Sequence, residues 1–243
     1  MKIIAVFCAT LLVAALSGCG GPDAPLPSAP PSSATPGETA EATVEDYFPL
    51  LENALYRYSG EGNEYAAYIV YNDYTGENCV QQRIDNGGTV MARVITAGGG
   101  KLAQVYSAGE AYYRENSLDK RGGEEVLLAE PITQGNAWTL ADGRTRSITG
   151  TKAAVSTPLG AYADAVEVTT QGENGTTVQY YVKEIGLVKT VFQDEGAQVS
   201  STLEAIERDV PAGQAVRLYF PDAAGEGLCY EDRELAFYTN DVT

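Results

Sequence analysis

Residues able to act as nucleophiles, general bases or metal ligands are unevenly represented in this chain. Its 243 residues include cysteines at positions 8, 19, 79 and 229, and no histidine. Histidine is the commonest general base, nucleophile activator and metal ligand in proteins. The sequence also lacks a Gly-x-Ser-x-Gly motif, a phosphate loop, and zinc or calcium ligand spacings. We therefore predict a protein that is not an enzyme, with no catalytic residue, no cofactor and no metal site.

The second cysteine ends an apolar stretch near the start of the chain. Residues 3–16 follow a single basic residue, Lys2, and lead into Leu16-Ser17-Gly18-Cys19. The stretch is shorter than the roughly 20 residues that a membrane-spanning helix needs. This arrangement resembles the signal peptide and lipobox of bacterial lipoproteins. The resemblance implies removal of residues 1–18 and a diacylglyceryl thioether on Cys19; the alternative is an ordinary secretory signal with an unrelated cysteine.

A lipidated Cys19 would anchor the mature protein at the extracytoplasmic face of a bacterial membrane, and a Gram-positive source is expected. Residues 19–43 would then connect the anchor to the folded part. This segment is rich in Ser, Ala and Thr and contains six prolines, Pro22, Pro25, Pro27, Pro30, Pro31 and Pro36. Such a composition builds neither a core nor a hydrogen-bonded ladder. We predict a disordered stalk that reaches roughly 70 Å when fully extended.

Acidic residues dominate the charge of the chain. Its 33 Asp and Glu against 16 Lys and Arg give a net charge of −17, which disfavours nucleic acid as a partner. Glu61 with Glu64, or Glu124 with Glu125, could supply the two carboxylates of a glycan hydrolase. At this acidic content, neighbouring carboxylates arise by chance, and solvated loop charges also explain both pairs.

Turn and strand signals predict an antiparallel β domain over residues 44–209. Asn-Gly and Asp-Gly are the strongest short hairpin signals, and they separate strand-like runs at Asn86-Gly87, Asp142-Gly143 and Asn174-Gly175. Gly98-Gly99-Gly100 and Glu195-Gly196 mark two further turns. The pattern favours a curved up-and-down sheet in the form of a half-barrel, barrel or sandwich. One short helical turn is expected within residues 45–56, limited by Pro49.

Aromatic residues admit two interpretations. The chain has 16 Tyr against five Phe and one Trp, and many of the Tyr lie in predicted strands. They could form a platform for a sugar or an apolar ligand, but Tyr is also a good strand residue with an apolar body and a polar tip, and we favour that structural interpretation. Trp138 is likewise predicted to anchor the core. Cys79 and Cys229 could form a disulfide outside the cytoplasm, although two separate thiols are favoured.

The end of the chain resembles the opening of the GerMN domain of sporulation and spore-germination lipoproteins. The resemblance rests on residues 216–222, Gly227-Leu228 and residues 230–235, with supporting similarity in Tyr47-Phe48-Pro49-Leu50, residues 58–65, 138–144 and 186–192. A GerMN domain continues into helices and further strands, whereas this chain stops after two predicted strands. We therefore expect residues 210–243 to be the truncated start of an α+β GerMN domain.

Together these features predict a non-enzymatic, membrane-anchored envelope lipoprotein that acts as a scaffold or interaction module in sporulation, germination or cell-wall processes. Its expected partners are the membrane, through the lipid anchor, and an envelope protein or cell-wall component of unknown identity. Two alternatives stay open. One is a half-barrel that carries a lipid or other apolar ligand, and the other is a carboxylate-based hydrolase of wall glycans.

Overall fold

A computed structural model describes residues 41–212 of the chain, and these residues form a strongly curved antiparallel sheet. Its elements are η1 (Glu45–Tyr47), β1 (Leu55–Glu61), β2 (Tyr68–Thr75), β3 (Cys79–Asp85), β4 (Val90–Gly98), β5 (Lys101–Ala108), β6 (Glu125–Ala129), β7 (Ala137–Thr139), β8 (Thr145–Thr157), β9 (Gly160–Gly172), β10 (Gly175–Val182), β11 (Gly186–Gln193) and β12 (Gln198–Glu207). The predicted β fold and the short helical turn are confirmed.

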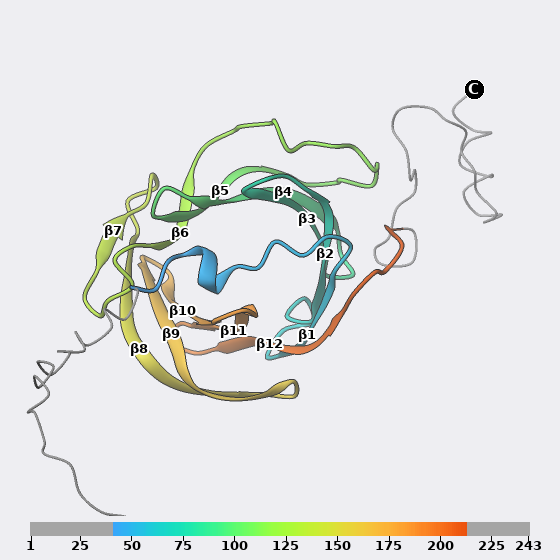
Figure 1. The fold of residues 1–243 in the computed structure, drawn as a ribbon. Coiled ribbons are helices and arrows are strands. Elements are labelled where there is room, and N and C mark those ends of the chain that lie inside the picture. The colour runs from blue at the N-terminus through green and yellow to red at the C-terminus, as the bar shows by residue number, and fades with distance from the viewer. Residues whose placement is uncertain (1–40, 213–243) are drawn as a thin grey trace, which may run out of the picture. The chain divides into compact units, whose positions relative to one another are not determined.

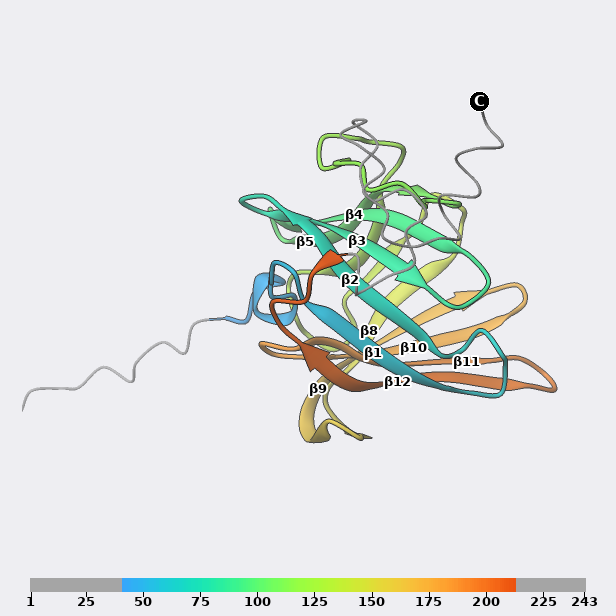
Figure 2. The ribbon, with the colours of Figure 1, turned by 90° about the vertical axis from the view of Figure 1, so that its right-hand side faces the viewer.

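The topology is up-and-down, with one long-range pairing between the first and last strands. The order across the sheet is β6-β5-β4-β3-β2-β1-β12-β11-β10-β9-β8-β7, and every adjacent pair is antiparallel. Figure 1 shows the strands curving around a central space, and Figure 2 shows the same sheet from the side. The edge strands, β6 and β7, are therefore consecutive in the chain.

Side chains, and not a backbone ladder, join the two edges. The indole N–H of Trp138 donates to the Val126 carbonyl at 3.0 Å, and the Asn136 amide donates to the Ala129 carbonyl at 2.9 Å. Trp138 also packs, as predicted, against the main core, the buried cluster that includes Ile95, Leu128 and Ile148. These bonds occupy carbonyls of β6 that a closed barrel would pair with a neighbouring strand. The sheet is barrel-like but is not closed by strand pairing.

Turn chemistry sets the local register. The side-chain oxygen of Asn86 accepts bonds from the Gly88 and Thr89 amides, at 3.0 and 3.1 Å, and Gly87 adopts a positive φ of 83°. This left-handed backbone is accessible to Gly without a steric penalty. The hairpin pairs Gln82 with Arg93, residues of neighbouring strands that face the same side of the sheet. The predicted turns at residues 98–100, 142–143, 174–175 and 195–196 are also confirmed.

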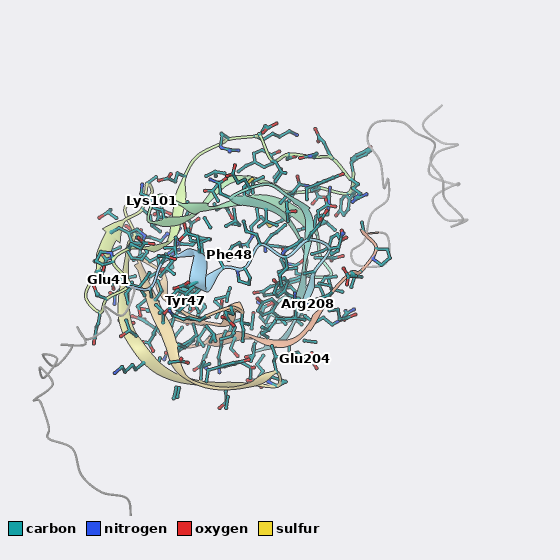
Figure 3. All side chains as sticks on the ribbon, in the orientation of Figure 1. Glu41, Tyr47, Phe48, Lys101, Glu204 and Arg208 are labelled. Atoms are coloured by element: carbon teal, nitrogen blue, oxygen red, sulfur yellow. The ribbon has the colours of Figure 1, made fainter. Side chains whose placement is uncertain are left out.

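The interior of the curved sheet is filled from one end by the segment that precedes β1. Val44 is fully buried and Tyr47 is 5 % exposed, and both pack with strand residues such as Ile95, Ile148 and Tyr181. Figure 3 shows Tyr47 and Phe48 inside the ring of strands. The Val44 amide donates to a Glu130 carboxylate oxygen at 2.9 Å, which fixes the entering chain. We call residues 42–51 the N-terminal strap.

Two segments cover the outer face of the sheet. The distal part of the β8–β9 hairpin curves past β11 and β12 (Figure 1), and its residues Val155 and Ala165 belong to a buried cluster that also contains Val188 and Leu203. The long connection from β5 to β6, residues 109–124, lies over β2–β4. Leu118 from this connection joins a cluster with Val94, Ala103 and Val105. Parts of the sheet are thus buried on both faces.

After β12, the chain stays in contact with the sheet up to Ala212, the last described residue. Val210 donates to the Asn53 carbonyl at 3.0 Å and accepts from the Tyr71 hydroxyl at 2.9 Å. Val210 and Ala212 pack against buried Leu55 and Tyr71. The lipobox with Cys19, the predicted linker to residue 40, the GerMN-like residues 216–235 and Cys229 lie outside the described residues.

Candidate functional site

The most extensive buried charge network in the described residues lies on the outer face. Asp73, whose side chain is fully buried, accepts from Arg83 Nε at 2.6 Å and from Arg114 Nε at 3.0 Å. The Gln81 amide donates to the same carboxylate at 3.1 Å, and the Gln81 carbonyl accepts from the Ser117 backbone at 2.6 Å. Arg83 also donates to the carbonyls of Ala111 and Tyr113.

The network fastens the 109–124 connection onto β2 and β3. Buried ions persist only when they are paired and hydrogen-bonded. Here Arg83 and Gln81 of β3 bond to Asp73 of β2, and Arg114, Ser117 and the carbonyls of Ala111 and Tyr113 join that pair of strands to the connection. The geometry is that of a structural clamp in which the buried Asp73 carboxylate compensates the buried Arg83 and also pairs with the partly exposed Arg114.

A cavity of about 30 Å³ lies in the interior, beneath the N-terminal strap. Its lining includes the apolar residues Phe48, Pro49, Val70, Ile185 and Leu187. It also includes Tyr56, Tyr58, Tyr68, Gln82 and Arg93, which carry polar groups. A space of this size holds one or two water molecules or a polar group of similar size.

Arg93 supplies the positive charge of this cavity. Its half-buried guanidinium donates through Nε and Nη2 to the Gln82 side-chain oxygen, at 3.0 and 2.8 Å. Gln82 in turn donates to Asn72 at 2.9 Å, and Asn72 donates to the Leu51 carbonyl of the strap at 2.7 Å. No carboxylate within residues 41–212 forms an ion pair with Arg93.

Tyrosine rings surround that charge. Tyr58 and Tyr68 stack with ring centroids 4.6 Å apart, and the Tyr58 hydroxyl donates to the Leu187 carbonyl at 2.7 Å. Burial raises the pKa of Tyr68 to about 12 and that of Tyr58 well above its usual range, against a smaller opposing effect of Arg93. Burial also raises the pKa of Tyr56 to about 12. These hydroxyls therefore stay neutral and can donate hydrogen bonds at physiological pH.

Each nominated glutamate is either exposed or held in an ion pair. Glu124 pairs with Lys101 at 3.2 Å, and Glu125 pairs with Arg146 at 2.8 Å. Glu61 and Glu64 are exposed near the β1–β2 turn. Among the described residues, no group of three or more His, Cys, Asp or Glu side chains is placed to hold a metal ion. Cys79 is a free thiol, half-buried beside Val94 and Leu118. Cys229 lies outside the described residues, so the expectation of two separate thiols stays a prediction.

Sequence reasoning did not find the Arg93 cavity. Val80, Gln82 and Ile84 of β3 point inward, while Gln81 and Arg83 on the other face are also buried. Polar side chains on both faces erase the alternation that would have marked an interior cation. The usable signal was the hairpin at Asn86-Gly87, which pairs Gln82 with Arg93.

Comparisons with known proteins give no family for this chain. No protein family model and no curated protein match it. Among solved structures, a candidate lipoprotein from Parabacteroides distasonis is 14% identical, with a TM-score of 0.41, over 66% of this chain and 98% of that one. A candidate exported protein with a YmcC-like fold from Bacteroides fragilis is also 14% identical, with a TM-score of 0.36, over 67% and 99%. At these scores the likeness assigns neither a fold family nor a function.

No helix within the described part of the chain is both long enough and apolar enough to cross a membrane. Membrane attachment through Cys19 therefore rests on the sequence of residues 2–19 alone.

Proposed function

We propose that this protein is a bacterial envelope lipoprotein whose β domain serves as a non-enzymatic scaffold or interaction module. The observation that carries the proposal is the N-terminal strap. The chain that would lead from the lipidated Cys19 enters the sheet and is fixed there by Val44 and Tyr47 in the main core and by the bond from Val44 to Glu130. A tether attached in this way connects the membrane to the buried core of the domain.

The ionisable groups support a binding role over catalysis. Buried Asp73 and Arg83 form an ion pair in the outer clamp, and buried Arg146 of β8 is paired with Glu125 of the edge strand β6. Catalytic carboxylates instead need a shared cleft and different proton affinities. The wall-hydrolase alternative is tested directly by incubating the purified protein with wall glycan, and release of soluble fragments would contradict the proposal.

Location is tested by comparing the wild-type chain with Cys19→Ser. The wild-type protein should sediment with membranes and enter the detergent phase, whereas the variant should do neither because it has no acylated sulfur. Equal distribution of both proteins would contradict the lipid anchor.

Cross-linking in intact envelopes, with Cys19→Ser as the matched control, should then recover an envelope protein or wall partner. A role in sporulation or germination is proposed from the sequence resemblance at residues 216–235, with its supporting similarity in residues 47–50, 58–65, 138–144 and 186–192.

The cavity favours a second candidate function, carriage of a ligand with an apolar part. Its lining combines the apolar side chains of Phe48 and Pro49 with the polar groups of Tyr68 and Arg93. The remaining interior is filled by side chains of the main core, so a long acyl chain enters only if the strap moves. Native mass spectrometry tests this function: a co-purifying lipid supports carriage, and a mass equal to that of the protein alone opposes it.

A further inference from the structure

We propose that Arg93 forms, with Tyr68, a binding site for the carboxylate of a small organic acid inside the curved sheet. This site goes beyond the proposed scaffold role and does not depend on the lipid anchor. The three observations that support it are the charge balance of the interior, the unused donors around the cavity, and the size of that cavity.

Arg93 is a half-buried cation without an anionic partner in the described residues. Its guanidinium bonds only to a neutral amide oxygen, that of Gln82. The other interior arginine of the described chain, Arg146, is paired with Glu125 at 2.8 Å and also donates to Thr170. Removing an arginine from water is costly unless an anion compensates it. In a chain with a net charge of −17, the site at Arg93 is thus the place where an external anion would complete the pairing.

The donors come second. A guanidinium has five N–H groups, and the two bonds to Gln82 leave three for a ligand. The Tyr68 hydroxyl faces the same cavity and makes no hydrogen bond within residues 41–212, while the neighbouring Tyr58 hydroxyl is already bonded to Leu187. Arginine holds carboxylates through two parallel bonds, and Tyr68 can add a third donor.

Cavity size and charge select the ligand. About 30 Å³, the space of one or two water molecules, suits a carboxylate that carries no more than a methyl group and leaves little room for a tetrahedral phosphate, and one cation balances one negative charge. The methyl group of such an acid would lie against Phe48 and Pro49. Those residues belong to the strap, so an acid bound here would also contact the segment that leads to the proposed tether.

Gln82→Glu is the sharpest test, because it places a carboxylate of this chain next to Arg93 without changing the side-chain length. The full chain is titrated calorimetrically with acetate at constant ionic strength, and with acetamide as the uncharged control. We expect saturable acetate binding to the wild type that weakens by about tenfold or more in Gln82→Glu and in Arg93→Gln. Tyr68→Phe should weaken it by several fold.

Arg57→Gln is the matched control, since Arg57 is an exposed arginine that pairs with Glu207 and does not line the cavity. It should bind acetate as the wild type does. The proposal is overturned if the wild type shows no saturable acetate binding, if acetamide binds equally well, or if Arg93→Gln and Gln82→Glu retain wild-type affinity. Should Arg93→Gln fail to fold, Gln82→Glu decides alone. None of these outcomes depends on where the protein resides.

Discussion

Replacing Asp73 by Asn would test whether the outer clamp holds the domain together. The substitution keeps the shape of the side chain but removes the charge that Arg83 and Arg114 share. Arg83 is 1 % exposed and cannot be rehydrated without local opening, so it would be left as an unpaired buried cation. Removing one partner of such a pair costs about 3–5 kcal/mol. Arg114 is 35 % exposed and adds less, about 1 kcal/mol or below.

Urea unfolding measures this loss. With a denaturant slope of about 2 kcal/mol/M, a loss of about 4 kcal/mol lowers the midpoint by about 2 M. Glu207→Gln is the control, because the Arg57–Glu207 pair is nearly half exposed on both sides and should contribute about 0–1 kcal/mol. The Asp73→Asn protein should also become sensitive to trypsin within residues 109–124, whereas Glu207→Gln should not. A loss below about 1 kcal/mol for Asp73→Asn, with an unchanged slope, would refute the reasoning.

Three further predictions concern the strap, the tyrosines and the end of the domain. Val44→Ala should destabilise the protein by roughly 2 kcal/mol in urea, because Val44 is fully buried, whereas exposed Glu45→Gln should have little effect. The free energy of unfolding should fall between about pH 10 and 12. In the unfolded chain the tyrosines lose their protons at about pH 10, whereas burial keeps Tyr56 and Tyr68 protonated to about pH 12 in the folded protein. A free energy of unfolding that does not change with pH in this range would contradict that burial. A chain ending at Ala212 should have the melting temperature of the full chain. A chain ending at Asp209 should lose about 1–3 kcal/mol of unfolding free energy, because it lacks the Val210 bonds to Asn53 and Tyr71. Equal melting temperatures of the two truncated chains would show that these contacts are dispensable.

The sequence predicted the hairpins well because their signals are local. Asn86-Gly87 and Asn174-Gly175 each specify a tight turn through backbone geometry that neighbouring residues alone determine. Trp138 was correctly expected to pack on the core because a single large ring in a polar segment needs an apolar neighbour. Its bond to Val126 could not be foreseen, since it joins the two edges of the sheet and depends on the total curvature of all the strands between them.

The interior cavity escaped prediction for a related reason. Arg93 and Gln82 can be paired from the turn between them, but which face of the pair points inward depends on what covers each side of the sheet. Residues 109–124 cover the outer face there and bury Arg83, so burial and polarity no longer distinguish inside from outside. The strap adds Phe48 from a segment that is remote in sequence from both strands.

Intact-mass and N-terminal peptide analysis of the protein isolated from its native cells tests the central claim most directly. The lipoprotein account predicts a mature chain that begins at Cys19, with a mass increased by a diacylglyceryl group on the sulfur and no residues from 1–18. A chain that begins elsewhere, or one in which Cys19 carries a free thiol, would contradict the proposed anchor and with it the proposed place of the β domain in the envelope.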